Sequence, residues 1–239
     1  MCYNISLLSS GNLELRYAAR FPSTWMSTPV YYINAFTIPY HPIILNEEPD
    51  VFHLMQWGLI PFWVKTLEDA EKIRMQTMNA RSETLFEKPS FRHATQHRRC
   101  LIPADGFFEW RQYHGKNYPY YVRLKNEEIF SIAGIYEKWT PKESDETIET
   151  FSVITCDANP LMQKLHNKKK RMPVILSKND ERKYLDKELT KTDIESFFKP
   201  YPEERMHAYT ISRLVASKTQ DRNVPPVIEP YEYPELPPL

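Results

Sequence analysis

Cys2 follows Met1 directly in this chain of 239 residues, and its position allows chemistry that no internal cysteine can perform. If Met1 is trimmed, Cys2 carries a free α-amine and a thiol on neighbouring carbons, with ordinary pKa values near ~8 and ~8.5. Such an aminothiol condenses with an aldehyde to an imine, which the sulfur closes into a thiazolidine ring. The alternative interpretation is that Cys2 is only a small residue at the start of the first strand. The interpretation therefore depends on which groups the fold brings to Cys2.

Two distant residues are candidates for proton transfer. Glu109 lies in Gly-Phe-Phe-Glu-Trp-Arg, where strand alternation places it on the same face as Phe107. Burial on an apolar face raises the pKa of a carboxyl group toward the range useful for catalysis, whereas the alternative is a salt bridge to Arg99 or Arg111. His166 stands near the end of an expected helix. It is either a proton shuttle with a pKa near neutral or a cap at the helix C-terminus.

Asn79 and Arg81 form a second pair of candidates, in the stretch Asn-Ala-Arg-Ser-Glu-Thr. Asn79 is either a turn residue or an amide that orients a reacting group. Arg81, two residues further on, would share its strand face and could hold a phosphate in a bidentate fork.

Clustered basic residues and tryptophans are a third feature. The basic runs are Arg98-Arg99 and Lys168-Lys169-Lys170-Arg171, and such runs usually mark solvated loops. Trp57 and Trp63 flank Leu59-Ile60-Pro61. Aromatic rings beside cations are typical of a platform for single-stranded nucleic acid, although both rings could equally belong to the core.

Composition limits the class of protein. The 31 basic and 31 acidic residues balance, so no global field steers the chain to nucleic acid or membrane, and any polyanion site must be a local patch. Only 5 glycines against 20 prolines favour short strands with stiff connections. No apolar run is long enough to span a bilayer, and the first residues lack a secretion signal pattern. Three cysteines without pair spacing fit a reducing, cytoplasmic compartment, and no metal or cofactor motif is present.

The elements that must position these residues are mostly strands. We expect strands at 5–8, 30–37, 42–45, 51–60, 99–103, 106–112, 118–124, 129–139, 150–156, 174–176 and 207–215. Asp105-Gly106 predicts a hairpin turn between two of them. Short helices are expected at 13–19, 66–75, 91–97, 160–166, 179–186 and 193–198, with Pro160 at a first helical position. Residues 1–219 are predicted to form one domain. The proline-rich tail, 220–239, is expected to pack on it or extend from it.

The motifs Met-Cys, WGLIPFW, NARSET, RRCLIPADGFFEW and H…RMPVIL, in this order, resemble the SOS-response-associated peptidase-like, or abasic site processing, family. The resemblance covers roughly residues 1–215 and is highly specific because several motifs recur in order. It implies a single α+β domain. Mostly antiparallel sheets would form an open pseudo-barrel with peripheral short helices, and the active site would lie in a groove across it.

The family implies binding of single-stranded DNA, including single-strand/duplex junctions, and covalent capture of abasic sites. Its catalytic residues match Cys2, Asn79, Glu109 and His166, and its DNA-contacting arginines match Arg81 and Arg171. The amine of Cys2 would attack the C1′ aldehyde of the ring-opened sugar. Glu109 would transfer protons, His166 would assist at the sugar hydroxyl, and Asn79 would position the amine. The family is also credited with cleaving the peptide bond before the cysteine.

Two departures from the family pattern stand out. The usual Cys-Gly-Arg opening is Cys2-Tyr3-Asn4 here, so one expected DNA-contacting arginine is missing. Four residues instead of one separate His166 from Arg171, and three of them are Lys168, Lys169 and Lys170. We hypothesise that this basic loop replaces the lost phosphate contact.

Two rival functions remain from the residues alone. A thiol peptidase would use Cys2 against other proteins, with His166 as the base. A non-covalent module for modified bases or single-stranded DNA would need no free amine. In each case we expect a monomer that is not bound to a membrane, located in the cytoplasm or on the nucleoid of a bacterium.

Overall fold

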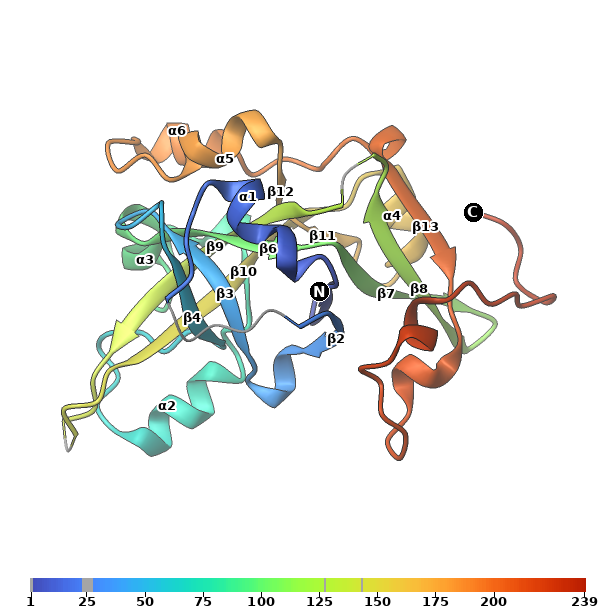
Figure 1. The fold of residues 1–239 in the computed structure, drawn as a ribbon, viewed down its shortest axis with the longest axis horizontal. Coiled ribbons are helices and arrows are strands. Elements are labelled where there is room, and N and C mark those ends of the chain that lie inside the picture. The colour runs from blue at the N-terminus through green and yellow to red at the C-terminus, as the bar shows by residue number, and fades with distance from the viewer. Residues whose placement is uncertain (1, 23–27, 127, 143) are drawn as a thin grey trace.

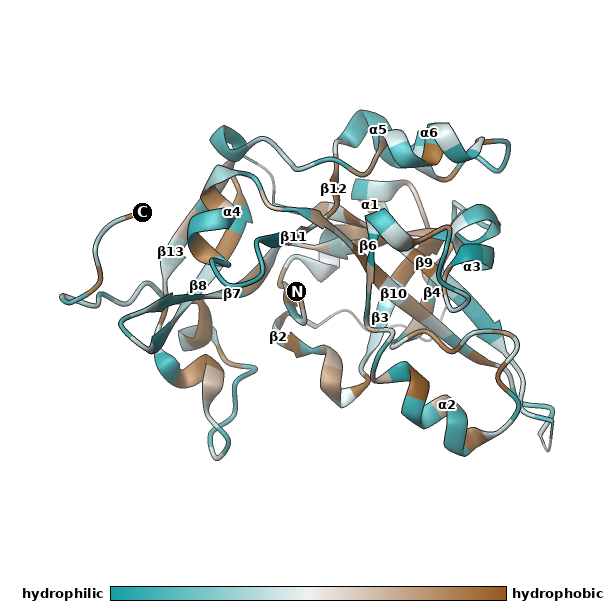
Figure 2. Ribbon diagram, turned by 180° about the vertical axis from the view of Figure 1, so that it is seen from behind, coloured by the Kyte–Doolittle hydropathy of each residue, from teal (hydrophilic) through white to brown (hydrophobic). Residues whose placement is uncertain are grey.

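The computed structural model describes residues 2–22, 28–126, 128–142 and 144–239, which form two β-sheets with short helices at the periphery (Figure 1). The described strands pair mostly antiparallel, which confirms the predicted α+β class. Figure 2 shows hydrophobic residues concentrated in the strands of the barrel, while the helices carry polar residues on their outer sides.

The smaller sheet holds the start of the chain. In the described part of the protein it has five strands in the order β13-β8-β7-β1-β2. Their bounds are β1 (Asn4–Leu7), β2 (Val30–Asn34), β7 (Gly106–Tyr113), β8 (Lys116–Leu124) and β13 (Met206–Thr210). A hairpin joins β7 to β8 through His114 and Gly115, whose φ values of 45° and 76° are those of a type I′ turn.

The larger sheet closes on itself. Its strands, among the described residues, are β3 (Tyr40–Leu45), β4 (Phe52–Trp57), β5 (Asn79–Arg81), β6 (Arg99–Ala104), β9 (Phe130–Trp139), β10 (Ile148–Asp157), β11 (Arg171–Pro173) and β12 (Ile175–Leu176). The pairings run from β10 through β4, β3, β6 and β9 and return to β10. This ring is the pseudo-barrel that the sequence predicts, and β5 and β11 extend it from β10 toward the smaller sheet.

The predicted hairpin at Asp105-Gly106 is wrong, because β6 and β7 belong to different sheets. Asp105 holds the crossing point through its carboxylate. The carboxylate accepts hydrogen bonds from Ser6 Oγ (2.6 Å), from the main-chain N–H of Leu8 and from that of Ser9 (3.1 Å). These partners come from the first strand and the turn that follows it, so the crossing is joined to the start of the chain. The predicted late strand is also shorter than expected, ending at Thr210.

Short helices flank the sheets. They are α1 (Leu13–Tyr17), α2 (Leu67–Arg74), α3 (Arg92–His97), α4 (Pro160–Leu165), α5 (Lys178–Tyr184) and α6 (Lys191–Ser196). The side chain of Asn159 accepts a hydrogen bond from the N–H of Met162, so α4 begins with a capped turn and Pro160 follows the cap. The helix ends at Leu165, and His166 is its C-cap residue.

The C-terminal tail packs on the outer face of the smaller sheet. Val227 is fully buried there with Phe108 and Ile211. Asn223 Oδ1 accepts hydrogen bonds from the N–H groups of Tyr31 and Tyr32, on an edge strand. The described part of the tail therefore covers a sheet edge and an apolar face.

Two further findings concern the described ranges. They include no helix long and apolar enough to cross a bilayer. Nor do they bring together three or more histidine, cysteine, aspartate or glutamate side chains in a way that could hold a metal ion.

We predict that Gly106→Ala destabilises the protein. A Cβ at this position would lie 2.1 Å from ring atoms of Tyr121, whose hydroxyl is hydrogen-bonded to Ser6 and so cannot swing away cheaply. Overpacking of this kind costs about 1–3 kcal/mol, measurable by urea unfolding. The control is Gly115→Asn, since asparagine tolerates the left-handed backbone found at that turn. Equal stability of Gly106→Ala and the unmodified protein would contradict the assignment.

Candidate active site

Cys2 lies two residues before the start of β1 and is completely buried. Its Sγ is 3.9 Å from the main-chain oxygen of Asn4. Burial raises the pKa of the Cys2 thiol far above its ordinary range, and the negative charge of Glu109 raises it further. The thiol is therefore protonated at neutral pH, and the effect of Glu109 shows that the two side chains lie within electrostatic range of each other.

Glu109 occupies the middle of β7 with only 3% of its surface exposed. Phe107 packs in the main core and Phe108 in the smaller cluster on the opposite face, so the expected alternation along this strand is confirmed. Burial raises the pKa of Glu109 from 4.5 to about 7. A carboxyl group in this state can give and accept a proton near neutral pH.

The two arginines considered as salt-bridge partners of Glu109 bind elsewhere. The guanidinium of Arg99 donates to main-chain oxygens, including that of Tyr184, and the guanidinium of Arg111 donates to the main-chain oxygen of Pro237. An ionisable side chain close to Glu109 is that of His166, whose Nδ1 lies 3.7 Å from Glu109 Oε1.

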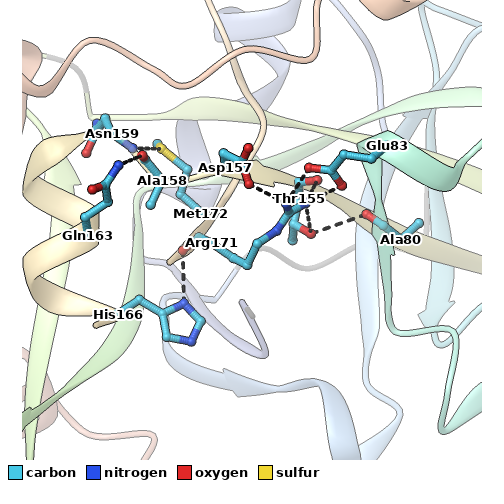
Figure 3. A network of polar contacts seen from close by, with 10 residues as sticks. All are labelled: Ala80, Glu83, Thr155, Asp157, Ala158, Asn159, Gln163, His166, Arg171 and Met172. Atoms are coloured by element: carbon cyan, nitrogen blue, oxygen red, sulfur yellow. Dashed lines mark hydrogen bonds and ion pairs between the residues drawn. The ribbon is translucent and has the colours of Figure 1, made fainter. Parts of the chain in front are cut away.

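His166 is the C-cap residue of α4 and is 92% buried, its exposed fraction being 8%. Its Nδ1 is 3.0 Å from the main-chain oxygen of Arg171, as Figure 3 shows. Burial lowers the pKa of His166 to about 4, so the ring is neutral at pH 7. Because a carbonyl oxygen can only accept, Nδ1 must carry the proton and Nε2 the lone pair. The ring therefore does not act as a charged cap at the end of α4, although His166 occupies the C-cap position.

Asn79 lies on β5, which pairs in parallel with β10. Its exposed fraction is 9%, and neither its side-chain oxygen nor its side-chain nitrogen has a hydrogen-bond partner among the described residues. Buried amides are normally paired, so this one is available to a bound molecule. Arg81 shares the same strand face and is exposed. Burial raises the pKa of Tyr3, and the positive charge of Arg81 opposes this rise. Arg81, on β5, therefore lies within electrostatic range of Tyr3 at the start of the chain.

Arg171 is mostly buried, and carboxylates hold its guanidinium. Glu83 binds both terminal nitrogens, Asp157 Oδ1 is 2.9 Å from Nη1, and the main-chain oxygen of Thr155 is 2.7 Å from Nη2 (Figure 3). Direct contact of Arg171 with DNA stays a prediction. Sequence reasoning missed this clamp, although Glu83 belongs to the NARSET motif that signals the neighbouring residues.

The basic loop is anchored to the candidate site. The side-chain amide of Asn167 exchanges two hydrogen bonds with the main chain of Gln112, on β7. Lys168, Lys169 and Lys170 are exposed, and Lys170 has a left-handed backbone with φ of 48°. Lys169 lowers the pKa of Glu109, an effect secondary to the rise caused by burial. The loop therefore projects positive charge beside the candidate proton-transfer group.

The two tryptophans have different environments. Trp57 is fully buried, with its indole N–H bound to the main-chain oxygen of Met78. Trp63 is 44% exposed and lines a surface cavity of about 400 Å³ together with Phe62 and Phe86. Trp57 is thus a core residue, whereas Trp63 stays available for base stacking.

The chain matches the family profile described as SOS response associated peptidase (SRAP) over residues 3–218, and it therefore belongs to this family. Among its relatives, it is 42% identical over 177 residues to "Abasic site processing protein YoqW" of Bacillus subtilis, covering 73% of this chain and 75% of the relative. It is 33% identical over 155 residues to "Abasic site processing protein HMCES" of Xenopus tropicalis, covering 57% and 45%.

Solved structures share the fold. A crystal structure of a protein from Bacteroides thetaiotaomicron superimposes with a TM-score of 0.91 at 40% identity, covering 97% of this chain and all of the other. One from Bordetella bronchiseptica gives a TM-score of 0.75 at 26% identity and covers 88% of this chain.

The raised pKa of Glu109 predicts a pH-dependent loss of stability. The folded state keeps the proton up to about pH 7, whereas the unfolded state releases it near 4.5, so stability falls as pH rises between these values. Glu109→Gln has no such titration. Between pH 5 and pH 8 the unmodified protein should lose about 2–3 kcal/mol more than Glu109→Gln, by urea unfolding. An exposed control, Glu229→Gln, should follow the unmodified protein. Parallel curves for all three proteins would refute a buried, protonated Glu109.

Proposed function

We propose that the protein senses abasic sites in single-stranded DNA and captures their aldehyde as a thiazolidine on Cys2. The names of the curated relatives support processing of abasic sites. The observation that carries the chemical proposal is the buried grouping of Cys2, Glu109 and His166. Three segments distant in the sequence supply an aminothiol, a carboxyl group with a pKa of about 7 and a neutral imidazole.

The reaction begins with the amine of Cys2 once Met1 is removed. The amine nitrogen attacks C1′ of the ring-opened sugar, and the resulting carbinolamine loses water to give an imine. Glu109 supplies the proton that the departing hydroxyl needs and then takes back the proton released by nitrogen. The sulfur of Cys2 next adds to the imine carbon while the thiol proton passes to nitrogen. One water is lost overall, and the masked aldehyde no longer promotes strand cleavage.

His166 and Asn79 assist this chemistry in the proposal. With its proton on Nδ1, His166 offers the lone pair of Nε2 to a sugar hydroxyl and helps the ring to open. Asn79 brings one donor and one acceptor without a described protein partner, which suits orientation of the amine against the sugar. The same residues would carry out the self-removal of Met1, so autopeptidase activity precedes capture.

The DNA strand would run over the exposed cations and rings around this grouping. Arg81 and the loop of Lys168, Lys169 and Lys170 would contact phosphates, with Arg171 beneath them, and Trp63 would stack on a base. This arrangement favours single strands and single-strand/duplex junctions over continuous duplex, and one copy of the chain supplies every group.

We predict that the unmodified protein forms a heat- and denaturant-resistant adduct with abasic single-stranded DNA on a gel. Cys2→Ala should lose this adduct because it lacks sulfur, while Cys156→Ala, at another buried cysteine, should retain it. Glu109→Gln should slow adduct formation by about 10²–10⁴-fold, the range typical of losing an acid–base group.

The rival functions give different outcomes in the same assay. A peptidase of other proteins would turn over unrelated peptides, whereas self-processing alone yields no turnover. A non-covalent module would bind equally well after Cys2→Ala and give no resistant adduct with any variant. Abasic DNA whose aldehyde has been reduced to an alcohol should also give none.

Salt dependence tests the basic loop. Alanine at Lys168, Lys169 and Lys170 should flatten the slope of log affinity against log salt by about 2, since each phosphate contact on a single strand contributes roughly 0.7. Fluorescence anisotropy with undamaged single-stranded DNA measures this slope. The control triple variant replaces Lys178, Lys187 and Lys191, on or beside the helices α5 and α6. An unchanged slope for the loop variant would reject its role as a phosphate contact.

A further inference from the structure

Glu83 links the two halves of the candidate site. It lies in the 3₁₀ turn Ser82–Thr84, directly after the strand that carries Asn79 and Arg81. Its carboxylate binds both terminal nitrogens of Arg171, one of them at 3.0 Å, in a fork-to-fork pair (Figure 3). Bidentate pairs of this kind fix geometry as well as charge. Arg171 is the first residue of β11, and its main-chain oxygen is hydrogen-bonded to the ring of His166.

The main chain anchors this end of β11 over a short stretch: Arg171 is paired with Asp157 on β10, and the main-chain oxygen of Lys170 accepts a hydrogen bond from the N–H of Ala158 (3.0 Å). The strand is three residues long and closes with Pro173, which has no N–H to donate. It follows Lys170, which has a left-handed backbone, and its pairing with β10 runs over three residues. A side-chain clamp on Arg171 adds to this main-chain support and fixes the direction of its carbonyl.

We propose that Glu83 is a positioning residue, which acts through Arg171 to hold His166 in the tautomer with the proton on Nδ1. The Arg171 carbonyl requires an N–H opposite it and so leaves the lone pair on Nε2. If the guanidinium loses its clamp, the carbonyl shifts, and the preference of the neutral ring for a proton on Nδ1 weakens. This inference deepens the proposed function by assigning a role to a residue that would not touch the sugar.

Glu83 is a stronger candidate for this role than Asp157. Glu83 contacts both terminal nitrogens of Arg171, whereas Asp157 contacts one, and the Asp157 side chain is 82% exposed against 47% for Glu83. Asp157 is also the last residue of β10, and its main chain is already paired with Arg171. Removing Asp157 should therefore disturb His166 less than removing Glu83.

The direct test reads the His166 ring without any DNA. Nitrogen-15 NMR of the uniformly labelled protein at pH 7 distinguishes protonated from unprotonated ring nitrogens, with His166→Gln identifying the signals. The unmodified protein should show one tautomer, protonated at Nδ1. Glu83→Ala and the milder Glu83→Gln should show averaging toward a mixture of both. Asp157→Asn should change the signals less, and the exposed Glu87→Gln should leave them unchanged.

Kinetics give a second readout. Glu83→Gln should slow adduct formation on abasic single-stranded DNA by about tenfold, the size expected for a lost supporting contact. Its non-covalent affinity, measured in a Cys2→Ala background, should change less than twofold. Thermal unfolding identifies any variant that fails to fold. Because Glu83→Gln keeps the shape of the side chain, it can still be compared with the unmodified protein if Glu83→Ala does not fold.

The outcomes separate this inference from the proposed function. An unchanged His166 tautomer in folded Glu83→Ala overturns the positioning role. A large gain in DNA affinity with an unchanged tautomer also overturns it, because Glu83 would then be a competitor of phosphate for Arg171. If the tautomer depends on Glu83 while the unmodified protein forms no adduct, the positioning role stands and the proposed capture of abasic sites fails.

Discussion

The burial of Glu109 beside Cys2 is the constraint on which the candidate site depends. Both side chains have almost no exposed surface, so burial disfavours the ionised form of each, and the negative charge of Glu109 further disfavours ionisation of the Cys2 thiol. The Cys2 thiol is therefore protonated near pH 7, whereas the pKa of Glu109 lies close to that pH. The fold thus keeps the thiol neutral and the carboxyl group able to give or accept a proton near pH 7, at a cost in stability that a structural carboxylate would not incur.

The architecture makes this burial possible. The first strand pairs with both β2 and β7, so the start of the chain is held in the interior of a sheet rather than at a free end. Asp105 ties the crossing between the sheets to the same strand, and α4 delivers His166 from the other side. The strands β5 and β11, both paired with β10, bring Asn79 and the Arg171 clamp to the edge of the barrel that faces this region. Elements far apart in the sequence thus carry one site.

Sequence reasoning predicted local features well. The two-residue period of a strand was enough to place Glu109 with Phe107 and against Phe108, and the Asn159-Pro160 pair marked where α4 begins. It failed where a distant partner decides the outcome. Asp105 looked like a hairpin residue because its partners in β1 lie about a hundred positions earlier.

Long-range pairing also explains what the sequence left open at the site. The clamp of Glu83 on Arg171 joins residues 88 positions apart, and no local pattern signals it. Trp57 and Trp63 are six positions apart in one motif, yet one is core and the other surface. The family resemblance supplied the four candidate residues together. Their mutual geometry came from the structure, which places His166 Nδ1 3.7 Å from Glu109 and Cys2 within electrostatic range of Glu109, with Asn79 on β5 beside β10.

Mass spectrometry of the peptide that carries Cys2, after reaction with abasic single-stranded DNA and digestion of both partners, tests the central claim most directly. The account predicts an adduct whose mass is the sum of peptide and sugar fragment less one water, with Met1 absent and the sugar bound to both nitrogen and sulfur of Cys2. An adduct on a lysine, or on a chain that still begins with Met1, would contradict it.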